Sequence, residues 1–213
     1  MPLRSAWLAL VAGCYSFPTM GRARMIERGH VEVWAAPEAL IVATPGSATQ
    51  QAGASERPVV EGGVRYGFTD AVELGARAGT FGIATGPRIQ LVRAPDPESG
   101  VDVALAPALA FTLPDKPAAE LPVLVGWNLA GRHQIVVSAR LVYQQHWGVG
   151  GISGPVHFAY AGGSVGFAWQ VTHHVALLPE VAFLTQIYSE PGFTSELPDA
   201  IGLQAGVGIL WDR

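Results

Sequence analysis

The sequence QIVVSARLVYQ, residues 134–144, decides the fold because the character of its side chains alternates with a period of two. One face is apolar and consists of Ile135, Val137, Ala139, Leu141 and Tyr143. The other face is polar and includes Gln134, Ser138, Arg140 and Gln144. Successive side chains of a β-strand point to opposite faces, so this pattern predicts a strand with one apolar and one polar side.

Nine other segments carry strand-like patterns, and Gly and Pro residues separate them. The predicted strands are 30–43, 58–67, 71–80, 86–94, 100–112, 121–129, 133–144, 156–170, 174–187 and 200–211. Most of them reach the length of about 9 to 11 residues that a tilted membrane strand requires. A count of eight strands is the alternative if the first segment or the short connection 81–85 is misread.

The connections between these strands alternate in length. Short connections are predicted at 68–70, 96–99, 130–132 and 171–173, and longer ones at 44–57, 113–120, 145–155 and 188–199, with 81–85 as a short exception. Long loops at one end and tight turns at the other are typical of transmembrane barrels, in which both ends of the strand series lie on the tight-turn side.

The composition favours a membrane environment. Apolar residues make up 49% and charged residues only 14% of the chain, whereas about a quarter of a soluble domain is charged. The sequence has no apolar run long enough for a spanning helix, which leaves a closed barrel as the other spanning structure. We therefore predict an all-β fold, a closed antiparallel up-and-down transmembrane β-barrel of about ten strands.

A soluble sandwich or barrel would show the same alternation with its apolar face turned inward. The polar faces carry mainly Gly, Ala, Ser and Gln, and the chain has a single lysine, Lys116. This composition suits a crowded lumen better than a solvated exterior. With 17 acidic and 13 basic residues and no basic patch, the chain is not expected to bind nucleic acid.

Charged residues on the polar faces predict a lumen braced by ion pairs. A three-residue turn at 68–70 would place Arg65 opposite Glu73 and Glu61 opposite Arg77. Further charged residues on the inward faces are Arg88, Asp102, Arg140 and Glu180. A nearly balanced set of charges favours a braced interior over a conducting pore.

Aromatic residues gather at the predicted strand ends. The tight-turn side has Tyr66, Phe68, Trp127, Trp169 and Trp211, and the long-loop side has Phe111, Tyr143, Phe158 and Tyr188. Two such groups predict the aromatic girdles that mark the two interfaces of a membrane.

The N-terminus has the features of a secretory signal: Arg4, the apolar run 6–11 and the small residues Ala12 and Gly13. The run 11–14, VAGC, resembles the lipobox of bacterial lipoproteins. That resemblance implies cleavage before Cys14 and a lipid on its sulfur, and Tyr15 in the next position implies delivery to the outer membrane. The alternatives are an ordinary signal peptide with an incidental cysteine and a buried N-terminal helix. We expect a signal peptide at 1–13, a periplasmic tether at 14–29 and the barrel at 30–213.

The architecture resembles small outer-membrane β-barrels of Gram-negative bacteria, the group that contains OmpA-like domains and the ten-stranded omptins. The resemblance implies a location in the cell outer membrane with membrane lipid as a partner, and it implies no activity. The polar residues favour no enzyme, cofactor or metal site. Near the long-loop side, His146, His157, Asp115, Glu190 and Asp199 belong to different loops without a motif. Ser164 and His157 fall on opposite faces of one strand, and adjacent His173 and His174 lack metal-ligand spacing.

The sequence therefore predicts a non-enzymatic barrel with a structural or surface-interaction role, in which the long loops would hold any extracellular ligand. Two alternatives remain open at this point. One is a narrow channel or lipid-handling barrel, and the other is a lipid-anchored periplasmic β-barrel that binds an apolar ligand.

Overall fold

The computed structural model describes residues 19–44, 53–80, 82–112, 116–147, 154–190 and 201–213. Its strands are β1 (Val31–Thr44), β2 (Gly53–Thr69), β3 (Val72–Gly79), β4 (Gly82–Val92), β5 (Gly100–Leu105), β6 (Ala108–Thr112), β7 (Lys116–Leu129), β8 (His133–Trp147), β9 (Pro155–Gln170), β10 (Val175–Ser189) and β11 (Ile201–Asp212). One short 3-10 turn, η1 (Ala130–Arg132), joins β7 to β8. Among the described residues, no helix has the length and apolar character needed to cross a membrane.

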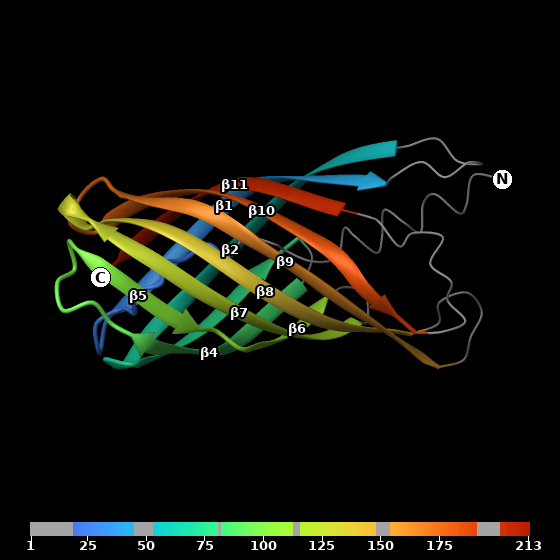
Figure 1. The fold of residues 1–213 in the computed structure, drawn as a ribbon, viewed down its shortest axis with the longest axis horizontal. Helices are drawn as coiled ribbons and strands as arrows, with labels where there is room; N and C mark the ends of the chain where they lie inside the picture. The colour runs from blue at the N-terminus through green and yellow to red at the C-terminus, as the bar shows by residue number, and fades with distance from the viewer. Residues whose placement is uncertain (1–18, 45–52, 81, 113–115, 148–153, 191–200) are drawn as a thin grey trace.

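Each strand pairs antiparallel with its neighbours, and the pairing of β1 with β11 closes the sheet. The strands cross the closed wall obliquely, with the C-terminus at the tight-turn end (Figure 1). The short strands β5 and β6 both pair with β4 on one side and β7 on the other. They are two halves of the single strand predicted at 100–112, interrupted at Ala106 and Pro107, so the prediction of a closed ten-stranded barrel is confirmed.

The interruption follows from local chemistry. Pro107 has no backbone N–H to give to the ladder, while the Ala106 N–H still donates to the Pro122 carbonyl at 2.9 Å. The Pro107 carbonyl also approaches Gly86 so closely that a Cβ there would lie 2.1 Å from its oxygen. The wall therefore stays closed at this position without a regular ladder.

The two faces of the wall have opposite character. Along β8, Ile135, Leu141 and Tyr143 are exposed on the outside, whereas Ser138 and Arg140 are buried inside. The same alternation runs along β11, where Ile201, Leu203, Val207, Ile209 and Trp211 are all exposed. Hydrocarbon is the solvent that stabilises such an apolar exterior, so the alternative of an inward apolar face does not describe this barrel.

The predicted register of the first hairpin is wrong by two residues. Gly67 pairs with Glu73, and Arg65 pairs with Gly75. An irregularity between Gly67 and Thr69 adds a residue at the turn, and a shift of two keeps every side chain on its expected face.

The connections at the long-loop end fall largely on 45–52, 81, 113–115, 148–153 and 191–200, outside the described residues. The expected signal peptide at 1–13 and the expected lipid-attachment residue Cys14 also lie outside them.

The apolar exterior generates a prediction for paired arginine substitutions. Leu141 lies near the middle of β8 and Leu129 at the tight-turn end of β7, and both are exposed. We expect Leu141→Arg to lower the free energy of unfolding by about 2–4 kcal/mol, because an arginine at the bilayer midplane is poorly solvated, and Leu129→Arg by about 0–1 kcal/mol. Urea unfolding in lipid vesicles, followed by heat-dependent mobility on gels, measures both. Equal losses at the two positions would contradict a membrane belt centred on Leu141.

Candidate functional site

The lumen is the candidate functional site, because it gathers the buried charged side chains of the barrel. Of the predicted residues, Glu61, Arg65, Glu73, Arg88, Asp102, Arg140 and Glu180 are buried inside, and Arg77 is nearly so. Three further inward carboxylates, Glu32, Glu38 and Glu120, were not among the predicted residues. Glu32 and Glu38 belong to the predicted strand 30–43, whose alternation could have found them. Glu120 falls in the predicted loop 113–120, but β7 begins at Lys116 and therefore includes it.

A chain of four charges crosses the lumen. Arg77 of β3 lies 3.4 Å from Glu61 of β2 and 2.6 Å from Glu120 of β7, and Glu120 lies 3.6 Å from Arg140 of β8. β3 and β7 are not neighbours in the sheet, so the contact between Arg77 and Glu120 spans the interior. A buried charge is destabilising unless an opposite charge lies close to it, and each of these four residues has such a partner.

A second group of pairs lies nearer the tight-turn end. Arg88 Nη1 is 2.9 Å from Glu73 Oε1, and these residues face each other directly across β3 and β4. Arg65 pairs with Glu32 of β1 rather than with the predicted Glu73. The register shift explains the exchange, because it moves Glu73 away from Arg65 and leaves it opposite Arg88.

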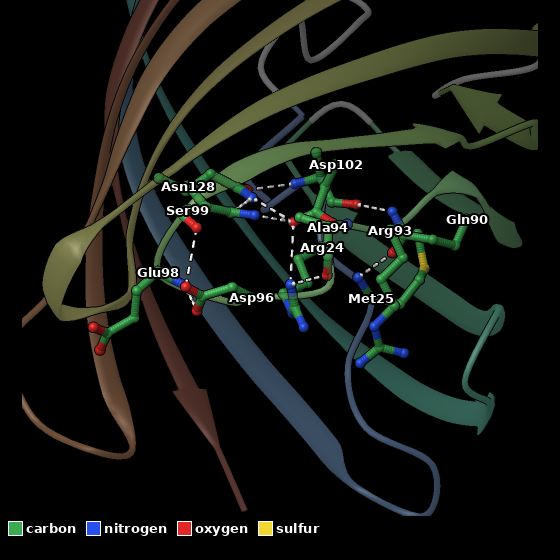
Figure 2. A network of polar contacts seen from close by, with 12 residues as sticks. Arg24, Met25, Gln90, Arg93, Ala94, Asp96, Glu98, Ser99, Asp102 and Asn128 are labelled. Atoms are coloured by element: carbon green, nitrogen blue, oxygen red, sulfur yellow. Dashed lines mark hydrogen bonds and ion pairs between the residues drawn. The ribbon is translucent and has the colours of Figure 1, made fainter.

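Asp102 organises a polar network at the tight-turn end (Figure 2). Its carboxylate accepts hydrogen bonds from the Ala94 N–H at 2.9 Å and from Asn128 Nδ2 at 2.7 Å, and it lies 3.6 Å from Arg24 Nη1. Beside this network Asp96 caps the β4–β5 turn by accepting from the Glu98 N–H and the Ser99 hydroxyl, and these bonds lower the pKa of the Asp96 carboxyl.

The segment expected as part of a periplasmic tether lies in the lumen instead. The described part of 14–29 begins at Thr19, and Met20, Ala23 and Met25 are buried inside the barrel. Thr19 and Met20 donate their N–H groups to the two oxygens of Glu180, at 2.8 and 2.9 Å. Glu180, which the sequence placed in a balanced set of lumen charges without a named partner, therefore binds main-chain donors of this segment.

The long-loop third of the lumen contains a cluster of buried apolar side chains beside the buried polar residues Thr112, Gln144 and His146. Its inward side chains include Leu40, Val59, Ala118, Val142, Val156, Phe158, Tyr160, Ala182 and Leu184. Phe158 was expected in the outer aromatic girdle, but its side chain points inward and its ring lies 4.7 Å from that of His146. The strand end alone does not fix the face, and Phe158 falls on the inward side of the β9 alternation.

The other expected girdle residues are exposed near strand ends. Tyr66, Phe68, Trp127, Trp169 and Trp211 lie at the tight-turn ends, and Phe111, Tyr143 and Tyr188 at the long-loop ends. The two groups are therefore positioned as interfacial rings would be.

The histidines and serines do not assemble into a catalytic group within the described part of the chain. The Ser164 hydroxyl forms a hydrogen bond with the Ser138 hydroxyl at 2.7 Å inside the lumen. His157 lies instead at the rim, where it contacts Tyr143 and where its Nε2 is 4.0 Å from Glu190 Oε2. Asp115 and Asp199 lie outside the described residues. No group of three or more metal-ligating side chains occurs among the residues that the structure describes.

No family model and no curated protein sequence matches this chain. Solved structures with a similar fold include the Neisserial surface protein A, at 13% identity and a TM-score of 0.44, covering 86% of this chain and 99% of that one. The N-terminal β-barrel domain of Pseudomonas aeruginosa OprF shares 15% identity with a TM-score of 0.40, covering 88% of this chain and all of that domain (100%). Ail of Yersinia pestis shares 9% with a TM-score of 0.36, covering 87% of this chain and 99% of that one. All three are outer-membrane β-barrel structures.

The pair of Arg88 and Glu73 generates a stability prediction. We expect Arg88→Met to lower the free energy of unfolding by about 3–5 kcal/mol, because it leaves the Glu73 carboxylate buried without its cation. Arg28→Met, at an exposed arginine of the N-terminal turn, should change it by no more than about 0.5 kcal/mol. The double variant with Glu73→Met should be more stable than Arg88→Met alone. Urea unfolding of the refolded barrels measures all three, and equal stability of the two single variants would refute the pairing.

Proposed function

We propose that this chain is a non-enzymatic barrel of the Gram-negative outer membrane that acts as a closed scaffold, with a structural or surface-interaction role carried by its long loops. The observation that carries the proposal is the ion-pair contact between Arg77 and Glu120, which joins two strands across the lumen. A cavity of about 90 Å³ lies beside these charges. A braced and filled interior suits a rigid support better than a wide pore.

The exterior supports the membrane part of the proposal. Outward side chains are apolar over the strand middles and aromatic near both ends. Outer-membrane lipid is therefore the partner that we propose for the wall, and an extracellular ligand, if the role is recognition, would bind at the long loops.

One loop variant separates the structural role from the surface role. In a strain that lacks the chain, we expect a variant with 45–52 and 191–200 replaced by short Gly-Ser turns to assemble as a heat-modifiable barrel. If it restores both the resistance to detergent and large antibiotics and the attachment of cells to surfaces, the role is structural. If it restores the barrier but not the attachment of cells to surfaces, the loops carry the role.

Closure is tested on the purified barrel. Wild-type protein in planar lipid bilayers should give no stepwise conductance, because Arg77 and Glu120 cross the interior. Arg77→Met combined with Glu120→Met should raise the frequency of conductance steps, while Arg28→Met combined with Glu27→Met, which removes one exposed charge of each sign, serves as the charge-matched control. Large, regular steps from wild-type protein would favour the channel alternative and refute the closed scaffold.

We further propose that residues 1–13 are a signal peptide and that Cys14 carries a lipid. The barrel belt alone provides enough apolar surface for retention, whereas a single lipid anchor gives limited affinity. We therefore expect Cys14→Ser behind a non-lipoprotein signal to stay in the outer-membrane fraction and to lose labelling by a radioactive fatty acid. Release of this variant as a soluble species would contradict a membrane barrel, and equal labelling would contradict lipid at Cys14.

A further inference from the structure

The segment Thr19–Ile26 lies in the tight-turn half of the lumen without joining any strand. Figure 2 shows Arg24 and Met25 from this segment beside side chains of the β4, β5 and β7 wall. A chain inside a lumen must satisfy its own N–H and C=O groups, because few waters reach it there. The partners of those groups therefore show how the lumen holds it.

The lumen side chains bind the main chain of this segment at most of its positions. Its N–H groups donate to wall side chains: Thr19 and Met20 to Glu180, Ala23 to Gln134, Met25 to Gln90 and Ile26 to Glu73, at 2.8 to 3.1 Å. Its carbonyls accept from wall side chains: Met20 from Arg65, Arg22 from Arg88 and Ala23 from Gln90. These acceptors and donors come from β2, β3, β4, β8 and β10.

The side chains of the segment divide into two kinds. Met20 packs with Trp34, Leu178 and Leu210 on one side of the lumen, and Ala23 and Met25 pack with Leu124 and Val136 on the other. The two arginines reach polar acceptors instead. Arg22 bonds to Gln170, and Arg24 lies 3.6 Å from Asp102 and 3.3 Å from the Ala94 carbonyl.

This arrangement is that of a peptide in a binding site rather than of a barrel strand. Contacts to main-chain groups are independent of peptide sequence, and side-chain pockets add selection, as in other modes of extended-peptide recognition. Gly21 fits closely, because a Cβ there would lie 2.1 Å from Arg65 Nη1. A cleft of about 290 Å³ at the tight-turn end, lined in part by Arg22, Arg24 and Met25, adjoins the segment.

We propose that the tight-turn half of the lumen is a binding site for an extended, arginine-containing peptide, and that Thr19–Ile26 occupies it in cis. The site accepts a second peptide of the same chemistry, with small or apolar residues between arginines, when the cis segment is displaced. The wall carboxylates and amides recognise its main chain, and Asp102 and Gln170 recognise its arginines.

A displaced variant and a matched control test the proposal in the full chain. Gly21→Val places a branched side chain against the guanidinium groups of Arg65 and Arg88. These groups hold the carbonyls of Met20 and Arg22, so moving them aside should release the segment. Gly154→Val is the control, because no atom lies within 4 Å of a Cβ at that glycine. The probe is a fluorescent synthetic peptide TMGRARMI, the sequence of residues 19–26, added to refolded barrels in nanodiscs.

We expect Gly21→Val to bind the probe at least tenfold more tightly than wild type or Gly154→Val, in which the cis segment fills the site. The same peptide N-methylated at the positions of Ala23 and Met25 should bind Gly21→Val at least tenfold more weakly, because it lacks the donors for Gln134 and Gln90. Binding to a folded Gly21→Val no tighter than to wild type, or unaffected by N-methylation, would overturn the proposal.

Hydrogen exchange of the wild-type chain tests the same idea if Gly21→Val does not fold. A displaceable segment predicts that the amides of Met20, Ala23 and Met25 exchange at least tenfold faster than those of Val136 and Leu178 in the adjacent wall, because they exchange whenever the segment leaves. Protection equal to that of the wall amides would identify the segment as a fixed part of the core and overturn the proposal.

Discussion

Complete pairing of backbone N–H and C=O groups in a wall that faces hydrocarbon is the constraint on which this structure depends. The pairing of β1 with β11 meets it by removing the last sheet edge. Closure then directs half of the side chains into a narrow interior. The exterior is apolar and excludes charged side chains. The charged residues of the strands are consequently buried together, and each must find its partner inside the lumen.

The alternating pattern of the sequence was sufficient to predict the barrel wall, because the two faces of a β-strand follow a period of two. It placed all ten strands and assigned Arg88, Asp102 and Arg140 to the inward face. It did not fix partners, because arginine side chains reach diagonally and across the lumen: Arg77 contacts Glu120 on a strand that is not its neighbour. Phe158 shows the converse error. Its position at a strand end predicts the outer aromatic girdle, whereas its place in the β9 alternation predicts the inward face that the structure shows.

The lumen segment could not be predicted from periodicity, because its binding uses main-chain groups and its own residues form no repeating pattern. One signal was nevertheless present in the sequence. Glu180 lies on an inward face without an arginine at a matching position of a neighbouring strand, where Gly166 and Gly206 pair with it. A buried carboxylate needs donors, and here Thr19 and Met20 bring two N–H groups to it. An inward acid facing glycines is therefore a reason to search for a segment inside the barrel.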